Sequence, residues 1–428
     1  MEHRRIYRRE FDERVHLWRL DNGLTAVLVR RPAYAHSAAL IVFRFGAVDL
    51  RVALDGRRFS MPAGTAHMLE HLSFERDEGC LFDAFSPLGA NANAYTSSTT
   101  TGYHFTCTRN FRRALALLLK AVRVFAAPVE TLRRERVVVT RELELSRQDP
   151  DWLLHKGLME ALYVRHPARL DIAGTPESVR KIRRSTLARA HEAFYRPDNA
   201  ILAAVGGVPP RKFIETVIEA AGDWKASGPR PRRIVSREPR KVGKRRVGLR
   251  APRMARHKFA VAFKDSPPRG GEAFVRHVLA AELACAAALG PSTDDYLRLY
   301  RRRLVDETFG IHYSAEPTFG HAILGGDSDD PSRSARAVVD AVRRKLRDGF
   351  DTDTFERMRR RVLGALLLRL NSLESTASML ADGLLVDHFY LDTPRMIETL
   401  TPGFVLSVAR SFIREDRMSI CTVSPAGE

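Results

Sequence analysis

Residues 64–71 read GTAHMLEH, and residues 67–71 within them carry the spacing His-x-x-Glu-His. On an α-helix, positions i, i+3 and i+4 lie on one face, so the side chains of His67, Glu70 and His71 are expected to converge. Two imidazoles one turn apart can hold one zinc ion, with the carboxylate beside a water molecule on the metal. The spacing therefore predicts metal-assisted hydrolysis; the alternative is a structural helix in which the spacing arose by chance.

A catalytic zinc ion needs three protein ligands and an open position for water, so one more ligand has to come from elsewhere in the chain. Residues 134–143 read RERVVVTREL and place Glu135 and Glu142 seven residues apart. Seven residues are two helical turns, so both carboxylates lie on one face of the expected helix. Either of them could bind zinc while the other supports the site.

The length and composition are those of a globular protein with two or three domains: 428 residues, 44% hydrophobic and 28% charged. Such a chain can bury real cores, which excludes intrinsic disorder and fibrous architectures. No apolar run approaches the roughly 18 residues of a membrane helix. The charged N-terminal segment is not followed by the apolar region of a secretory signal. We therefore expect no membrane association and a cytoplasmic location.

The net charge of +19, from 70 basic and 51 acidic residues, raises the question of nucleic-acid binding. Only 10 of the basic residues are lysine and 60 are arginine, and they are spread over the whole length. The richest clusters, residues 230–256 and 298–303, lack interleaved aromatic residues apart from Tyr300. Nucleic-acid binding is therefore the least favoured function.

Residues 226–256 combine Ser, Gly and Pro with many Arg and Lys and show almost no apolar periodicity, which predicts a basic, proline-rich linker. It separates a first domain, residues 1–225, from a second, residues 257–428. Both mix β-rich runs with helical periodicity, which predicts α+β folds with helices packed on sheets. The expected strands are 23–29, 38–45, 200–206, 258–263 and 321–325, and the expected helices are 111–125, 132–145, 153–162, 274–288, 331–348, 354–370 and 375–387.

Beyond the HxxEH spacing, the chain resembles the pitrilysin or insulinase-type inverzincin peptidases, a family that includes the mitochondrial processing peptidase. The resemblance covers nearly the whole chain. In the first domain it rests on LDNGL at 20–24, GANANAYT at 89–96, Asp149-Pro150, the segment 166–175, YRPDN at 195–199 and Val205-Gly206. In the second domain it rests on GPS at 290–292, residues 296–300, LVD at 304–306, GGD at 325–327 and NSLE at 371–374.

This resemblance implies two homologous domains, each a mainly antiparallel sheet covered by helices, that face each other across a substrate cleft. It implies that His67, His71 and Glu142 bind one zinc ion per chain, that Glu70 is the water-activating base and that Glu135 is a supporting acid. The expected reaction is endopeptidase cleavage of peptides or unfolded segments by metal-activated water. A non-catalytic or scaffold subunit of the same fold is the alternative function.

The resemblance also implies substrate contacts and a partner. Asn93 and Ala94 are expected on a strand to which a peptide adds, and Tyr313 is expected to touch the substrate. Many active members carry an Arg a few residues before this Tyr, whereas this sequence has Asp306 at that position, with Arg303 nearby. We therefore expect a heterodimer in which a homologous zinc-less subunit supplies the arginine. The alternative is a homodimer or a monomer that uses Arg303.

Overall fold

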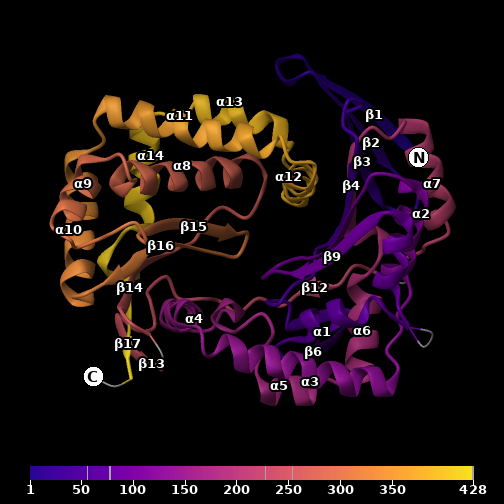
Figure 1. The fold of residues 1–428 in the computed structure, drawn as a ribbon, viewed down its shortest axis with the longest axis horizontal. Helices are drawn as coiled ribbons and strands as arrows, with labels where there is room; N and C mark the ends of the chain where they lie inside the picture. Colours follow the sequence, from indigo (N-terminus) through magenta and orange to yellow (C-terminus); the bar gives the residue numbers. More distant parts are fainter. Residues whose placement is uncertain (55, 77–78, 227, 253, 427–428) are drawn as a thin grey trace.

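The computed structural model describes residues 1–428 except 55, 77–78, 227, 253 and 427–428. Two halves lie side by side, the first drawn in indigo to magenta and the second in orange to yellow (Figure 1). Each half contains one main β-sheet and a set of helices. This confirms the expectation of two α+β domains.

The first half is built on a seven-stranded sheet in the order β1-β2-β3-β11-β4-β10-β9. Neighbouring strands are antiparallel except β3 and β11. The central strands are continuous aliphatic runs because both faces of the sheet are covered, as in β4 with the sequence SAALIVF. The strands are β1 (Glu2–Arg8), β2 (Glu13–Arg19), β3 (Thr25–Arg30), β4 (Ser37–Phe43), β9 (Ala90–Thr96), β10 (Thr101–Cys107) and β11 (Ala200–Gly206).

The helices of the first half bury one apolar face each. In α2, Leu115, Leu118 and Val122 recur at helical spacing and are fully buried. The helix α4 begins at Pro150, after Asp149, whose carboxylate accepts a hydrogen bond from the Asp151 backbone amide and caps the first turn. The helices are α1 (Thr65–Leu72), α2 (Phe111–Arg123), α3 (Val129–Ser146), α4 (Pro150–Leu162), α5 (Pro176–Lys181), α6 (Arg184–Phe194) and α7 (Pro210–Ala221).

The second half is built on a five-stranded sheet in the order β13-β17-β14-β16-β15. Its strands are β13 (Arg246–Ala251), β14 (His257–Asp265), β15 (Gly310–Glu316), β16 (Phe319–Ser328) and β17 (Met418–Pro425). Its helices are α8 (Gly271–Leu289), α9 (Asp294–Arg301), α10 (Pro331–Asp348), α11 (Thr352–Arg369), α12 (Leu373–Leu385), α13 (Thr393–Glu398) and α14 (Pro402–Phe412). Two small sheets join β12 (Arg232–Arg233) with β5 (Arg51–Leu54) and β6 (Arg57–Ser60), and β7 (Glu75–Arg76) with β8 (Gly79–Cys80).

The two main sheets share one topology. The order β3-β11-β4-β10-β9 in the first half corresponds to β13-β17-β14-β16-β15 in the second. In both, the first pair is parallel and the following pairs are antiparallel. Helices α3 and α11 have the same length, as do α4 and α12, and each second-half helix begins 223 residues after its counterpart. The halves are therefore homologous in architecture, although their residues differ too much to reveal the repeat.

Each half packs one of its helices on the main sheet of the other half. Helix α4 packs on β13, β14 and β17, where Leu158 and Leu162 join one apolar cluster with Ala260. Helix α12 packs on β4 and β11, where Leu380 joins a cluster with Val42. In Figure 1, α12 accordingly lies between the other second-half helices and β4. The exchange fixes the two halves against each other through two separate apolar contacts.

The expectation of a linker over residues 226–256 is wrong for residues 246–251, which form the edge strand β13 beside β17. Residues 232–233 also pair, as β12, with β5. In β13, Val247 and Leu249 alternate with charged or small residues and lie under α4. A period-two pattern this short is hard to see among so many arginines, so composition alone suggested a linker.

No single helix among the described residues is long and apolar enough to cross a membrane. Helices α8 and α9 reach the length and apolar composition of a membrane span only when they are taken together, and their axes are bent by 46° relative to each other. Most of the apolar side chains of α8 are buried in the second-half core.

Candidate active site

The start of the helix α1 is fixed by two close glycine contacts. Gly64 has φ +88°, a conformation that favours glycine, and a Cβ at this position would lie 2.4 Å from the carbonyl oxygen of Ala173. Gly174 faces back in the same way, since its Cβ would lie 2.5 Å from the carbonyl oxygen of Ala63. The hydroxyl of Ser178 donates to the same Ala63 oxygen at 2.8 Å. The backbone segments before α1 and α5 are therefore locked together.

Helix α1 presents one apolar face to the core and one polar face to α3. Met68, Leu69 and Leu72 are buried at 0–1% exposure. The opposite face carries His67 and His71, as the HxxEH spacing predicts.

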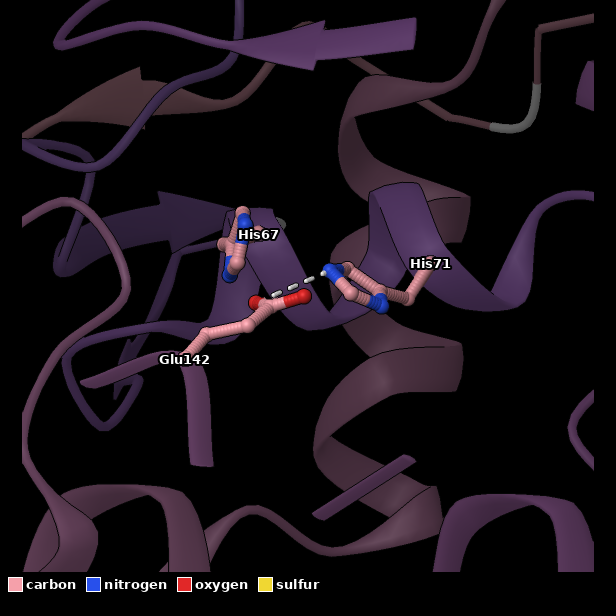
Figure 2. Close-up of side chains that lie close together, drawn as sticks. All are labelled: His67, His71 and Glu142. Atoms are coloured by element: carbon pink, nitrogen blue, oxygen red, sulfur yellow. Dashed lines mark ion pairs between the residues drawn. The ribbon is translucent and has the colours of Figure 1, made fainter. Parts of the chain in front are cut away.

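The polar face of α1 meets Glu142 of α3 (Figure 2). Donor atoms of His67, His71 and Glu142 all lie within 4.8 Å of one another, and this is the one such group of three or more among the described residues. Nε2 of His71 is 3.7 Å from a carboxylate oxygen of Glu142. Two imidazole nitrogens and one carboxylate oxygen are a donor set that zinc prefers.

The protonation state of His67 suits metal binding. Burial lowers the pKa of His67 to about 4, and the neighbouring His71 acts in the same direction. The imidazole is therefore neutral at neutral pH, as a metal ligand must be. Its Nδ1 is buried and has no hydrogen-bond partner among the described residues.

Glu135 lies on the other side of His71. Its carboxylate is 3.1 Å from Nδ1 of His71 and accepts a hydrogen bond from Arg134, and the residue is 8% exposed. A carboxylate on Nδ1 holds the imidazole with Nε2 facing Glu142, which is the usual support of a metal-binding histidine. The spacing alone left the roles of the two glutamates open, and the resemblance implied Glu142 as the ligand and Glu135 as the supporting acid. The structure brings Glu142 to the donor cluster and Glu135 to the opposite nitrogen of His71.

The side chain of Glu70 is held by a residue that the sequence analysis missed. The hydroxyl of Thr96, at the end of β9, donates a hydrogen bond of 2.6 Å to Oε2 of Glu70. Burial raises the pKa of Glu70, and the hydrogen bond from Thr96 opposes that shift. The alternation of side chains along β9 is the signal that would have placed Thr96 on the face toward α1.

A chain of buried hydroxyls anchors the end of α1. Ser73 donates to the carbonyl oxygen of Leu69 at 2.7 Å and lies 2.8 Å from the hydroxyl of Tyr103. The hydroxyls of Tyr103 and Tyr195 are 2.6 Å apart. This gives the YRPDN segment a structural role: its Tyr195, at the end of α6, contacts Tyr103 of β10, which in turn contacts Ser73 at the end of α1.

The expected substrate strand is an edge strand. Strand β9 pairs with β10 on one side, and no described strand pairs with its other edge. The exposed Asn93 accepts a hydrogen bond from the backbone amide of Ala94 at 2.8 Å. A free edge of this kind can accept an extended peptide as a further strand. A role for Asn93 and Ala94 in binding stays a prediction.

Tyr313 and Asp306, which the resemblance singled out in the second half, already bind other side chains of this chain. Tyr313, on β15, is 6% exposed and donates its hydroxyl to Asp265 at 2.6 Å. Asp306 forms an ion pair of 2.7 Å with Arg256, and Arg303 has a left-handed backbone with φ 54°. A substrate contact by Tyr313 stays a prediction, and it cannot use a free hydroxyl in this arrangement.

A cavity of about 1100 Å³ lies between the two halves. The first half lines it with Tyr95 of β9 and with Thr99 and Thr100 of the following turn, and the second half lines it from α8, α11, α12 and β15. Tyr95 precedes Thr96 in the chain but lies on the opposite face of the sheet, and neither Thr96 nor Glu70 is among the residues that line this cavity. Burial raises the pKa of Glu282, in the cavity wall, to about 7.

Comparison with known proteins identifies the family. The family model described as Insulinase (Peptidase family M16) matches residues 56–176, and the model described as Peptidase M16 inactive domain matches residues 181–362. YmfH of Bacillus subtilis (strain 168), named as a zinc protease, is 31% identical over 97% of this chain and 98% of its own. The chain belongs to the M16, or insulinase, peptidase family.

Solved M16 structures agree with the fold. An M16-like peptidase from Alicyclobacillus acidocaldarius superposes with a TM-score of 0.94 at 28% identity and covers 97% of this chain and 99% of its own. Pitrilysin, at 16% identity and a TM-score of 0.75, matches 99% of this chain but only 46% of its own, which shows the fold alone. The match to an inactive domain fits the position of the donor cluster, which lies wholly in the first half.

Proposed function

We propose that this M16 protein is a zinc-dependent endopeptidase, with His67, His71 and Glu142 as the ligands of one zinc ion per chain. The observation that carries the proposal is the convergence of these three donor groups within 4.8 Å. Glu70 directly precedes His71 in the chain, and its carboxylate can act as a base. A non-catalytic scaffold would have no need of such a complete donor set.

Zinc, when bound, supplies Lewis acidity that polarises a scissile carbonyl and makes water more acidic. Glu70 takes a proton from the attacking water at Oε1, because Oε2 is occupied by the Thr96 hydroxyl. The same carboxylate then passes the proton to the leaving amine. Glu135 orients His71 throughout.

The substrate in this proposal is an extended peptide. It adds along the free edge of β9 through backbone hydrogen bonds, with Asn93 and Ala94 at that edge. Tyr95 on the same strand faces the cavity between the halves, so the peptide can continue into it. Specificity then depends on the side chains that line this cavity.

The partner in this proposal is a homologous zinc-less chain. Asp306 occupies the place of the family arginine and is paired with Arg256. The relative from Schizosaccharomyces pombe named mitochondrial-processing peptidase subunit beta is 28% identical over 49% of this chain and 45% of its own. Pitrilysin carries about twice the length of this chain in one polypeptide. Both fit an enzyme assembled from two such units.

Cleavage of quenched fluorescent peptides tests the catalytic proposal. The zinc-loaded protein should cleave peptides, a chelator should abolish cleavage, and Glu70→Gln should lower the rate by roughly 10² or more while keeping zinc. Glu144→Gln, on the exposed side of α3, is the control and should behave like the unmodified protein. Wild-type turnover by Glu70→Gln would contradict the assignment of the base.

Reconstitution tests the partner. Cleavage should rise when a homologous zinc-less chain from the same organism is added, and the mixture should show a heterodimer by light scattering. Full activity of the chain alone that Arg303→Ala abolishes would contradict the heterodimer and favour the use of Arg303.

A further inference from the structure

Thr96 links the edge strand β9 to the helix α1. Side chains alternate along β9, and Ala92 and Ala94 pack against the first-half core while Tyr95 packs in the cluster on the opposite face of the sheet. Thr96 is two residues beyond Ala94, so its side chain points toward α1, which contacts β9. Its hydroxyl reaches Oε2 of Glu70 at 2.6 Å.

This contact is short and specific. Among the described residues, Thr96 is the one that donates a hydrogen bond to the side chain of Glu70, and none of them donates to Oε1. Hydrogen bonds to a charged oxygen are among the stronger ones in proteins, and they select one rotamer of the acceptor. Without the hydroxyl, the Glu70 side chain would be free to turn about its bonds and would lose the fixed direction of Oε1.

We propose that Thr96 is a positioning residue that holds Glu70 with Oε1 directed at the attacking water. The inference rests on the proposed function, because it concerns the base of that reaction. It also couples binding to chemistry: the strand whose free edge receives the peptide ends in the residue that orients the base. A base fixed in advance loses less freedom when the reaction begins.

Thr96→Val and Thr96→Ser test the proposal in the zinc-loaded protein. Valine has the shape of threonine without the donor, so kcat should fall roughly 10- to 100-fold while KM changes less than about threefold and zinc content stays constant. Serine keeps the hydroxyl and should restore kcat to within a few-fold. The matched control is Thr106→Val on β10, whose hydroxyl makes no hydrogen bond among the described residues.

Wild-type kcat in Thr96→Val would overturn the proposal, and so would a Thr96→Ser variant as slow as Thr96→Val, because packing of the methyl group would then explain the loss. Loss of zinc in Thr96→Val would also overturn it, since the threonine would then act on the metal site as a whole.

A second measurement does not depend on catalysis. In the metal-free protein, urea midpoints of Thr96→Val, Glu70→Ala and the double variant form a double-mutant cycle. The proposal predicts that Thr96→Val lowers the midpoint only when Glu70 is present. Equal shifts with and without Glu70 would show that the contact does not form. Failure of the wild-type protein to cleave any peptide would refute the proposed function but would leave the result of this cycle standing.

Discussion

Replacement of Leu380 by alanine should lower the stability of both halves of the molecule against unfolding. Leu380 belongs to the second half in sequence, but it is 0% exposed in a cluster with Leu40 and Val42 on the first-half sheet. A buried Leu→Ala change costs about 2–5 kcal/mol, and the upper part of the range applies where the surroundings cannot collapse. A seven-stranded sheet on one side is such a rigid surface, so we expect a loss of about 3–4 kcal/mol.

Urea unfolding followed by two probes measures the effect. Trp18 and Trp224 are buried in the first-half core, whereas Trp152 lies on α4, which packs on the second-half sheet. In a Trp152→Phe background, tryptophan fluorescence therefore reports the first half, while far-UV circular dichroism reports both halves. The helix exchange predicts that the two signals shift together in Leu380→Ala. Leu118→Ala, in the first-half core, is the control of equal burial. A fluorescence transition that stays at its wild-type midpoint in Leu380→Ala would refute the reasoning.

Two further predictions concern carboxylates. Glu282→Gln should stabilise the protein at pH 8 by about 1–3 kcal/mol and much less at pH 5. The folded state holds a proton on Glu282 up to about pH 7 while the unfolded state loses it near its ordinary, lower pKa, so stability falls as the pH rises between these values. Urea unfolding at both pH values measures this, and an equal gain at both would contradict it. Glu135→Gln should weaken zinc binding about 10- to 100-fold in a competition titration, because Gln is a weaker acceptor for Nδ1 of His71; unchanged affinity would remove Glu135 from the support of the site.

The donor residues were predictable because their arrangement is local. His67, Glu70 and His71 need only one helical turn, and the distance from Glu135 to Glu142 is fixed by two turns of α3. That regular helical geometry was enough to place both glutamates on one face of α3, and the resemblance to the peptidase family implied that this face meets the histidines.

The features that sequence reasoning missed depend on contacts between distant segments. Thr96 reaches Glu70 only because β9 is the edge strand next to α1, and no spacing rule connects two residues 26 positions apart in the chain. Strand β13 is a strand because β17 and α4 cover it, whereas its own arginines suggested a linker. Tyr313 is named by resemblance, but its hydroxyl is bound by Asp265, which lies 48 residues earlier.

Zinc content tests the central claim most directly. Elemental analysis of the purified protein should give about one zinc ion per chain, and Glu142→Gln should lose most of it, because two histidines alone leave the site one ligand short. Glu144→Gln, two residues further along the same helix and exposed, should keep the wild-type amount. A Glu142→Gln variant that still holds one zinc ion per chain would contradict the assignment of His67, His71 and Glu142 as the metal site.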